Sequence, residues 1–425
     1  MSVVGSMRKA RLDRFVELAR VYRGWSRSQL ADRLGRDPSR VVPETGNAKL
    51  DYVSRVADAL DWRLGDVVES IWLEELPTHE GEASFEELDE EAQTAHRSGD
   101  APRMLEIARQ MRGCAATATE RAIAANREAG AWDLRGRYGR SLEAVQLGLT
   151  EEGVCEDVRL MLHANLANAH YTLWHLIEAR SVAGDLVDRF TVRPATSRIE
   201  QIGEAFALYV RGSALRRSMA HAPPASRDEF ATRARKDLQR SRDRYESLAD
   251  AWHDQQYAAI AHTCRVAMLE CEAALHVIDP ADALQLVIER LGDASDLAAV
   301  PSGDWLESFG WWAIGGCNIA LEHLDGHELH RAMAVCTNKA LEIADRLDHW
   351  AMRERAFTME RFRRQCVEDS TGYETEWLLD DEDVRIVAGT MARFPRFRPT
   401  GWRILESARV FADLGVHAVH GMYRA

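Results

Sequence analysis

Five polar side chains in the C-terminal part of the sequence could hold a ligand through hydrogen bonds and charge. An asparagine amide both donates to and accepts from a peptide backbone, and an arginine guanidinium matches a carboxylate with paired donors. The alternative is that the asparagines cap or bridge neighbouring helical turns and that the arginines pair with the many acidic residues. The candidates for a peptide or small-molecule site are Asn165, Asn168, Asn318, Arg127 and Arg211.

Three tryptophans lie close together just before Asn318, namely Trp305, Trp311 and Trp312. Aromatic rings commonly line ligand pockets. Aromatic core packing is the alternative, and both interpretations stay open at the level of sequence.

Three histidines flank the dipeptide Asp325-Gly326, at His323, His327 and His330. Imidazoles at such spacing can in principle gather a zinc ion. No cysteine lies beside them, and an Asp-Gly pair is typical of a turn between helices. We therefore predict no metal site and no cofactor. The sequence also lacks a phosphate-binding glycine loop, HExxH and GxSxG, which favours a binding protein over an enzyme.

Charge is distributed unevenly along the 425 residues, whose net charge is −14. Residues 1–72 contain 13 Lys and Arg against 10 Asp and Glu, which gives +3 and leaves −17 for the remainder. A mildly basic head on an acidic body is consistent with nucleic-acid contact at one end only.

Compartment is indicated by the cysteines and by the absence of targeting features. The seven cysteines are odd in number and include no CxxC pair, which is typical of reduced thiols in a cytosolic protein. The N-terminal residues lack the apolar stretch of a secretory signal, and no run of about 20 apolar residues predicts a membrane span. A cytoplasmic location without membrane contact is expected.

The first 72 residues carry a closely spaced series of helix signals. Residues 12–23 have an apolar stripe at helical spacing, and Gly24 ends that helix. Ser26 and Gln29 form a capping box before a second helix, which stops at Gly35. The residues expected to be buried in these two helices are Phe15, Leu18, Ala19, Tyr22, Leu30, Ala31 and Leu34.

A third, short helix is expected to begin near Asp37, with Pro38 in its first turn and Pro43 at its end. The helix after it is predicted from an apolar stripe. Asp66 is expected to cap a further turn of helix. The stripe consists of Leu50, Val53, Val56, Ala57 and Leu60.

This order of helices resembles the helix-turn-helix domain of the Xre family of regulators. The resemblance rests on Gln29-Leu30-Ala31, Leu34-Gly35, Val41, Glu44-x-Gly46 and Val56-Ala57-x-Ala59-Leu60. It implies a DNA-binding domain over residues 8–72, whose second helix lies against phosphates and whose third helix enters the major groove. The implied DNA contacts are Ser28, Gln29, Arg36, Ser39 and Arg40, and Arg40 is the best match to a guanine edge.

The third helix departs from the family pattern. The segment before Glu44 is one residue shorter than usual, and Pro43 ends it, so the expected recognition helix is barely more than a turn and a half. The alternative is a degenerate head that no longer binds DNA and is retained for protein contact.

Small residues twelve positions apart mark pairs of helices in the rest of the chain. A bulky ring follows three positions after the first small residue. Apolar or small residues follow nine and sixteen positions after that same residue. Small side chains let two helix backbones approach, and large ones fill the space beside them. The pairs are Ala129 with Ser141, Ala167 with Ala179, and Ala320 with Ala332.

This pattern resembles the tetratricopeptide repeat, and residues 246–263 and 340–359 fit its manner. The resemblance implies an all-α solenoid of helix pairs over residues 84–425, with a terminal helix at 404–415 stopped by Gly415. It also implies a groove lined by the first helix of each pair, toward which Asn165, Asn168 and Asn318 face. An acidic linker at residues 73–83 precedes the array. An irregular all-α bundle is the alternative.

The combined architecture is similar to that of helix-turn-helix regulators with a tetratricopeptide array that respond to small peptides. The resemblance implies a transcription regulator that binds double-stranded DNA as a homodimer and takes a peptide or small-molecule signal in its array. A protein-interaction scaffold with a degenerate head is the alternative.

Overall fold

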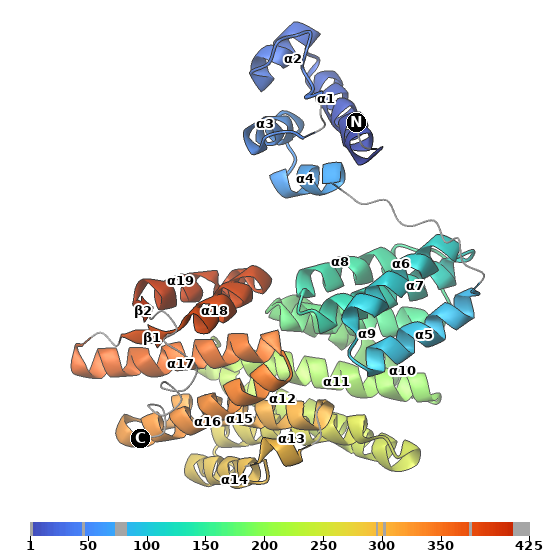
Figure 1. Cartoon of the computed structure of the whole chain (residues 1–425). Coiled ribbons are helices and arrows are strands. Elements are labelled where there is room, and N and C mark those ends of the chain that lie inside the picture. The colour runs from blue at the N-terminus through green and yellow to red at the C-terminus, as the bar shows by residue number, and fades with distance from the viewer. Residues whose placement is uncertain are drawn as a thin grey trace. The chain divides into compact units, whose positions relative to one another are not determined.

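The computed structural model describes residues 3–44, 47–72, 83–294, 296–300, 303–373 and 376–410. The chain divides into two compact units, Met1–Pro77 and Thr78–Ala425 (Figure 1). Over the described residues the secondary structure is 19 α-helices, two short 3-10 helices and two strands of three residues each. The predicted all-α class is confirmed. No described helix combines the length and the apolar character that a membrane crossing requires.

The first unit contains four helices packed around one core. They are α1 (Val3–Arg23), α2 (Arg27–Leu34), α3 (Leu50–Leu60) and α4 (Leu64–Trp72). The predicted capping box is confirmed, since Ser26 Oγ accepts from the Gln29 amide at 3.2 Å and Gln29 Oε1 accepts from the Ser26 amide at 2.8 Å. Gly35 ends α2 in the left-handed conformation, at φ 63°, which glycine adopts without steric cost.

The expected third helix near Asp37 is absent from the described residues 36–44. The chain makes a turn there, in which the Arg40 amide donates to the Asp37 carbonyl at 2.9 Å. The Asp37 carboxylate accepts from the Ser39 amide at 2.8 Å. An aspartate that binds the backbone two residues on competes with helix formation, and Pro43 removes a further donor. The prediction of a short recognition helix was therefore wrong.

Three predicted core positions in this unit were also wrong. The side chains of Leu18, Tyr22 and Leu50 are exposed by 46%, 58% and 66%. The stripe of α1 that packs on the core lies three positions, or about one helical turn, before the predicted one and uses Leu12, Val16 and Ala19, with Phe15 packed beside them. Leu50 is the first residue of α3 and precedes the turn whose side chains reach the core. Asp66 lies within the first turn of α4 and is not its cap.

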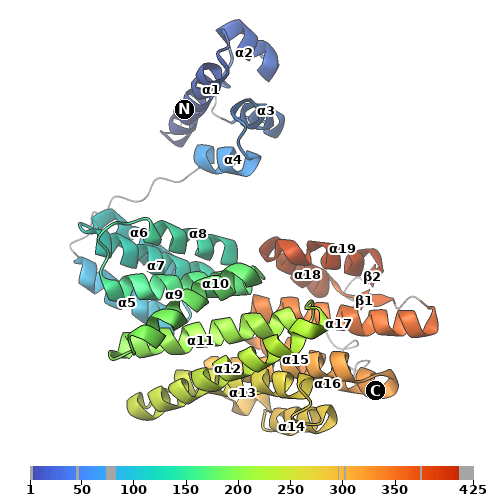
Figure 2. The same cartoon turned by 180° about the vertical axis from the view of Figure 1, so that it is seen from behind.

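The second unit begins with thirteen successive helices over its described residues (Figure 2). Each packs against its neighbour in the chain, and α7, α9, α11, α13, α15 and α17 also contact one another in that order. They are α5 (Phe85–Arg97), α6 (Ala101–Cys114), α7 (Ala118–Leu134), α8 (Tyr138–Leu149), α9 (Glu156–Thr172), α10 (Leu176–Val192), α11 (Arg198–Met219), α12 (Pro224–Trp252), α13 (Gln255–Ala274), α14 (Pro280–Gly292), α15 (Asp304–His323), α16 (Gly326–Arg346) and α17 (Trp350–Thr371).

The helix pairs predicted from small residues are confirmed. The three pairs correspond to α7 with α8, α9 with α10, and α15 with α16, and all six small residues are buried. The two further stretches, 246–263 and 340–359, span the turns between α12 and α13 and between α16 and α17. Close approach is clearest where α11 crosses α12, because a Cβ on Gly212 would lie 3.1 Å from the Ala234 carbonyl oxygen.

The C-terminal described residues form a cap on α17. It contains β1 (Trp377–Leu379), α18 (Asp381–Arg393), a 3-10 turn (Pro395–Phe397), α19 (Arg398–Glu406) and β2 (Ala408–Val410), with β1 and β2 parallel. The predicted helix at 404–415 was wrong after Glu406, where the chain turns into β2, and Gly415 lies outside the described residues. The expectation of an array without strands was wrong for these two short strands.

This cap also contacts the turn between α7 and α8. The Tyr138 and Phe394 rings lie 5.2 Å apart, and Arg393 Nε donates to the Arg135 carbonyl at 3.4 Å. Trp350 packs in the same apolar cluster. The last described helices of the unit therefore return to its α7–α8 region, and the odd-numbered helices from α7 to α17 surround an internal space.

Candidate functional site

Two adjoining cavities lie inside the second unit, with volumes of about 220 and 590 Å³. The smaller is lined by residues of α7, α9, α11, α13, α15 and α17, and each of these is the first helix of a pair. Both cavities include Tyr171, Tyr209 and Trp311 in their walls. A concave, aromatic-walled space with a few charged groups is the usual form of a small-ligand site.

One end of this space is dominated by arginines around Trp174. Trp174 occupies the turn between α9 and α10 with φ at 65°, a left-handed conformation that is uncommon for a bulky residue. Its ring centroid lies 4.5 Å from Cζ of Arg217, 4.5 Å from Cζ of Arg355 and 5.3 Å from Cζ of Arg396. Arg217 also lies over the Tyr171 ring, at 3.9 Å. Cation–π contacts hold the guanidinium groups but leave their in-plane donors available.

Arg217 and Arg355 differ from their neighbour Arg216 in having no ion pair within the described part of the chain. Arg216 donates to the Glu270 carboxylate, and Asn318 Nδ2 donates to the same Glu270 oxygen at 3.0 Å. Arg217 donates to the Tyr171 carbonyl at 3.3 Å, and Arg355, whose residue is 8% exposed, reaches only the Met359 sulfur at 3.8 Å. Burial lowers the pKa of Arg217, and it lowers the pKa of Arg355 to about 10.

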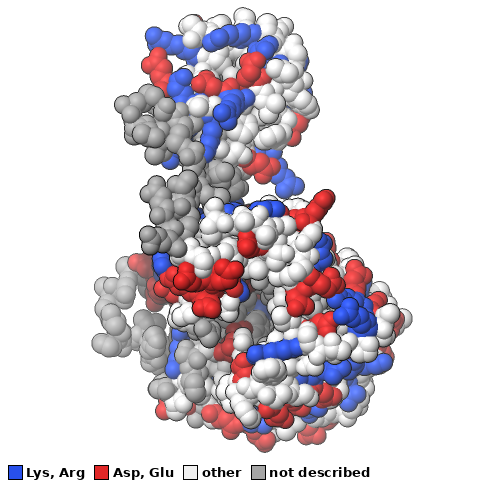
Figure 3. All heavy atoms as spheres, turned by 90° about the vertical axis from the view of Figure 1, so that its right-hand side faces the viewer, with Lys and Arg blue, Asp and Glu red and all other residues white. Residues whose placement is uncertain are grey.

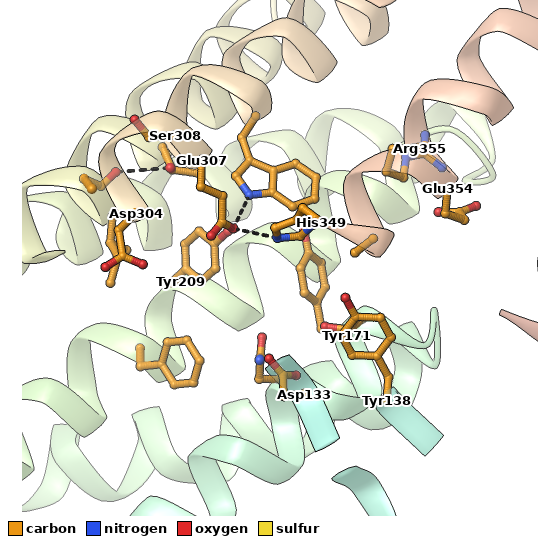
Figure 4. A pocket seen from close by; sticks show the side chains of 18 of the residues that line it. Asp133, Tyr138, Tyr171, Tyr209, Asp304, Glu307, Ser308, His349, Glu354 and Arg355 are labelled. Carbon is orange, nitrogen blue, oxygen red and sulfur yellow. Dashed lines mark hydrogen bonds and ion pairs between the residues drawn. The ribbon is translucent and has the colours of Figure 1, made fainter. Parts of the chain in front are cut away.

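The other end of the space carries carboxyl groups (Figure 4). Glu307 Oε1 accepts from Trp311 Nε1 at 2.8 Å and from His349 Nε2 at 3.1 Å. Burial raises the pKa of Asp133 to about 6, and burial with the nearby charge of Glu307 raises the pKa of Asp304. Burial alone would lower the pKa of His349, but the Glu307 carboxylate outweighs it and raises that pKa. Asp133 and Glu307 therefore share the nearby cationic group His349, whereas the charges near Asp304 are the carboxylates of Glu307 and Asp254.

The five residues predicted for a ligand site do not all meet in this space. Asn168 lines the smaller cavity and Asn318 the larger one. Asn165 instead donates to Asn126 at 2.7 Å. Arg127 pairs with Asp89 at 2.6 Å and Arg211 with Asp237 at 2.7 Å, so both arginines follow the alternative of pairing with acidic residues.

The three tryptophans predicted for a pocket also do not all meet in this space. Trp311 lines both cavities, whereas the rings of Trp305 and Trp312 each stack on the His262 ring, with centroid distances of 5.0 and 4.8 Å. No group of three or more possible metal ligands occurs among the described residues. The seven cysteines are all free thiols in the structure.

Sequence reasoning missed the charged residues that define the two ends of the space. Arg217, Arg355 and Trp174 come from three segments far apart in the chain, so no local spacing joins them. One signal was available, because Arg216 and Arg217 are adjacent cations in the second half of the helix at 198–219. Two adjacent cations on a buried helix need either acidic partners or an anionic ligand.

The residues proposed for DNA contact lie together on the first unit. Ser28 and Gln29 are exposed on α2, and Arg36, Ser39 and Arg40 are exposed in the turn that follows it. Gln29 is engaged by the capping box and Ser39 Oγ donates to Asp37. Arg36 lies over the Tyr52 ring at 5.2 Å. Figure 3 shows Lys and Arg side chains on the visible face of this unit, with Asp and Glu between them.

The turn after α2 is held in place by two further arginines. Arg27 Nε donates to the Pro38 carbonyl at 3.0 Å, and Arg55 donates to the Leu34 carbonyl at 3.2 Å. The Arg40 side chain makes no hydrogen bond or ion pair among the described residues. The segment is thus a fixed loop that presents Arg40 to solvent, and not a helix.

Comparison with known proteins gives no relative. No protein-family model matches the chain, and no curated protein is similar enough to be counted as one.

Proposed function

We propose that this protein is a DNA-binding transcription regulator whose helical array binds a peptide or small-molecule signal. The single observation that supports DNA binding most is the exposed pair Arg36 and Arg40, which have no acidic partner in the described part of the chain. They follow α2, on a segment of residues 1–72 with charge +3. Unpaired arginines on a small basic unit are suited to phosphates and guanine edges. The proposal assigns the chain no reaction, metal or cofactor.

The proposal also takes the first unit as Xre-like and the second as a tetratricopeptide-like solenoid. The capped α2, the left-handed Gly35 and the Val56–Leu60 core of α3 support the first assignment. Helices that pack as neighbouring pairs, with the first helix of each pair lining the internal cavity, support the second. A cytoplasmic location remains a prediction.

Homodimerisation is part of the same proposal. One loop with two free arginines gives little affinity for DNA, whereas two linked heads gain an effective-concentration advantage. A dimer would then bind paired half-sites about one helical turn apart.

The second candidate is a protein-interaction scaffold whose head does not bind DNA. The observation that favours it is the absence of a helix in the described residues 36–44, where a recognition helix was expected. A loop of this length brings few side chains to base edges. The two candidates share one fold and differ only in what the first unit contacts.

DNA binding by alanine variants separates the two candidates. In gel-shift titrations with the full chain and genomic promoter fragments, we expect Arg40→Ala to cost about 1–3 kcal/mol by loss of a base contact. Arg36→Ala should weaken all fragments alike and reduce the salt slope by about one phosphate contact.

Arg63→Ala is the matched control, because Arg63 is exposed between α3 and α4 on the same unit and makes no ion pair there. It should bind as the wild type does. Absence of any shift by the wild-type chain at low salt would exclude the regulator and favour the scaffold.

A further inference from the structure

We propose that the cavity of the second unit takes a zwitterion whose charges lie at its two ends, a short peptide with free termini. Its carboxylate would lie between Arg217 and Arg355 beside Trp174, and its ammonium group would lie in the part of the smaller cavity whose wall includes Asp304 and Asp133. This inference rests on the proposed function, in which the array binds a signal, and it names the chemical class of that signal.

The carboxylate subsite follows from two cations that the described chain leaves uncompensated. Arg355 is almost fully buried, and its one hydrogen bond goes to a thioether sulfur, a weak acceptor. Arg217 donates to a backbone carbonyl and forms no ion pair with a carboxylate of the described chain. Glu354 lies close enough to influence both, yet it forms no ion pair with either. A buried cation without a partner is costly, and an anionic ligand removes that cost when it binds.

A second observation at the same end also indicates a missing partner. Ser213 lines the larger cavity, is 1% exposed, and has no hydrogen-bond partner for its hydroxyl. Three groups that can donate, on α11 and α17, therefore share one wall. Arg216 differs from them because its charge is paired with Glu270, although its Nε also has no hydrogen-bond partner.

The ammonium subsite follows from carboxyl groups that form no ion pair in the described structure. Glu307 is held by His349 and Trp311, whereas the side chains of Asp133 and Asp304 form no ion pair in the described structure. In Figure 4, Asp304 and Arg355 lie on opposite sides of the view, with tyrosine and tryptophan rings between them. A ligand with opposite charges at its two ends and apolar groups in the middle matches this order.

The volume of the cavities suits such a ligand. The space of about 590 Å³ falls within the range of ordinary small-ligand pockets, and the smaller space of about 220 Å³ adjoins it at Tyr171 and Trp311. Free phosphate or a simple acid would fill only the arginine end and leave the carboxyl groups unpaired.

The test compares a synthetic library of mixed di- to hexapeptides that have free termini with the same peptides N-acetylated or C-amidated. Wild-type full chain is incubated with each library, and retained compounds are measured by affinity selection and mass spectrometry. We expect retention of free compounds, with at least about tenfold weaker retention after either cap. Equal retention of free and capped forms would overturn the proposal.

Variants assign the two subsites. Arg355→Gln should lose the preference for a free carboxylate but keep the preference for a free amine, and Asp304→Asn should do the reverse. Arg355→Lys keeps the charge and should keep part of the carboxylate preference. Arg233→Gln and Asp250→Asn, both at exposed positions of α12, should behave as the wild type. Circular dichroism and thermal unfolding check that each variant is folded.

A parallel DNA titration of the same preparations separates this inference from the proposed function. Retention of free peptides without DNA binding would support the zwitterion site and reject the regulator. DNA binding without retention of any library compound would reject the zwitterion site and leave the regulator standing.

Discussion

Three arginines near the cavity of the second unit differ in whether a carboxylate pairs with them. Arg216 is paired with Glu270, whereas Arg217 and Arg355 have aromatic rings but no carboxylate. A pKa of about 10 for Arg355, against an ordinary value near 12.5, corresponds to a cost of about 3 kcal/mol for holding the charged form in the folded chain. Binding sites often keep such destabilising groups because the ligand completes them.

Replacement of these arginines by methionine should therefore have opposite effects on stability. Arg355→Met should leave the free energy of unfolding unchanged or raise it by about 1–2 kcal/mol, because the lost cation–π contact offsets part of the relief. Arg216→Met should lower it by about 3–5 kcal/mol, because Glu270 is left buried without its cation. Urea unfolding of the ligand-free chain measures both, and a large loss for Arg355→Met would show that this arginine is structural.

The pKa of Asp133 predicts how ligand binding depends on pH. Its folded value of about 6 lies above the ordinary value of 3.8, so the carboxyl is protonated below pH 6 and cannot pair with an ammonium group. The affinity for a free-amine peptide should rise as pH increases through about 6. The charged or titratable groups that face Asp133 are His349, Glu307 and Tyr138.

His349 affects this profile in the same direction. The pKa of His349 is raised, so its imidazole loses its positive charge only at a pH above the ordinary histidine pKa. That loss leaves the site more negative. Asp133→Asn should remove the rise near pH 6 and keep any later rise due to His349. Isothermal titration between pH 5 and 8 measures the profile, and an affinity that falls with pH in the wild type would contradict the assignment.

At the scale of elements, the features that were predicted correctly depend on residues close together in the sequence. Ser26 and Gln29 are three residues apart, and the small residues Ala167 and Ala179 lie on consecutive helices, so their roles can be seen in the sequence. The turn at residues 36–44 was mispredicted because Asp37 satisfies backbone donors that a helix would otherwise use. The stripe of α1 was shifted because Leu12, outside the residues predicted to be buried, is part of the core.

The candidate site could not be predicted in the same way. Its residues come from the odd-numbered helices between α7 and α17, which meet only because the array returns on itself through Tyr138, Trp350 and Phe394. No periodicity in the sequence specifies that closure. Asn168 and Asn318 were placed near the cavity by the spacing of the repeat, whereas Arg127 and Arg211 were drawn away by Asp89 and Asp237.

Two glycines test how closely the helices pack. Gly212→Ala should lower stability by about 1–3 kcal/mol, because the new Cβ would lie 2.9 Å from Leu238 and 3.1 Å from the Ala234 backbone oxygen. Gly184→Ala, in the middle of α10 with only Arg211 Cδ at 4.0 Å, should raise stability by about 0.5–1 kcal/mol. Thermal unfolding compares the two, and equal effects would mean that the α11–α12 crossing is looser than described.

At the scale of the whole molecule, the chain joins a basic unit to an acidic one. Residues 1–72 carry +3 and the remainder −17, so under the proposed function the first unit is the part of the chain whose charge suits nucleic acid. The cavity lies wholly within the second unit and the candidate DNA contacts wholly within the first. A signal bound in the array would therefore act on DNA through the relation between heads in a dimer, and not by touching the DNA itself.

Genome-wide recovery of DNA bound to the full chain, compared between the wild type and the double variant Arg36→Ala with Arg40→Ala, tests the regulator proposal most directly. We expect discrete sites with paired half-sites about one helical turn apart, all lost in the double variant. Recovery of no enriched sites with the wild type, or of the same sites with the variant, would contradict the proposal.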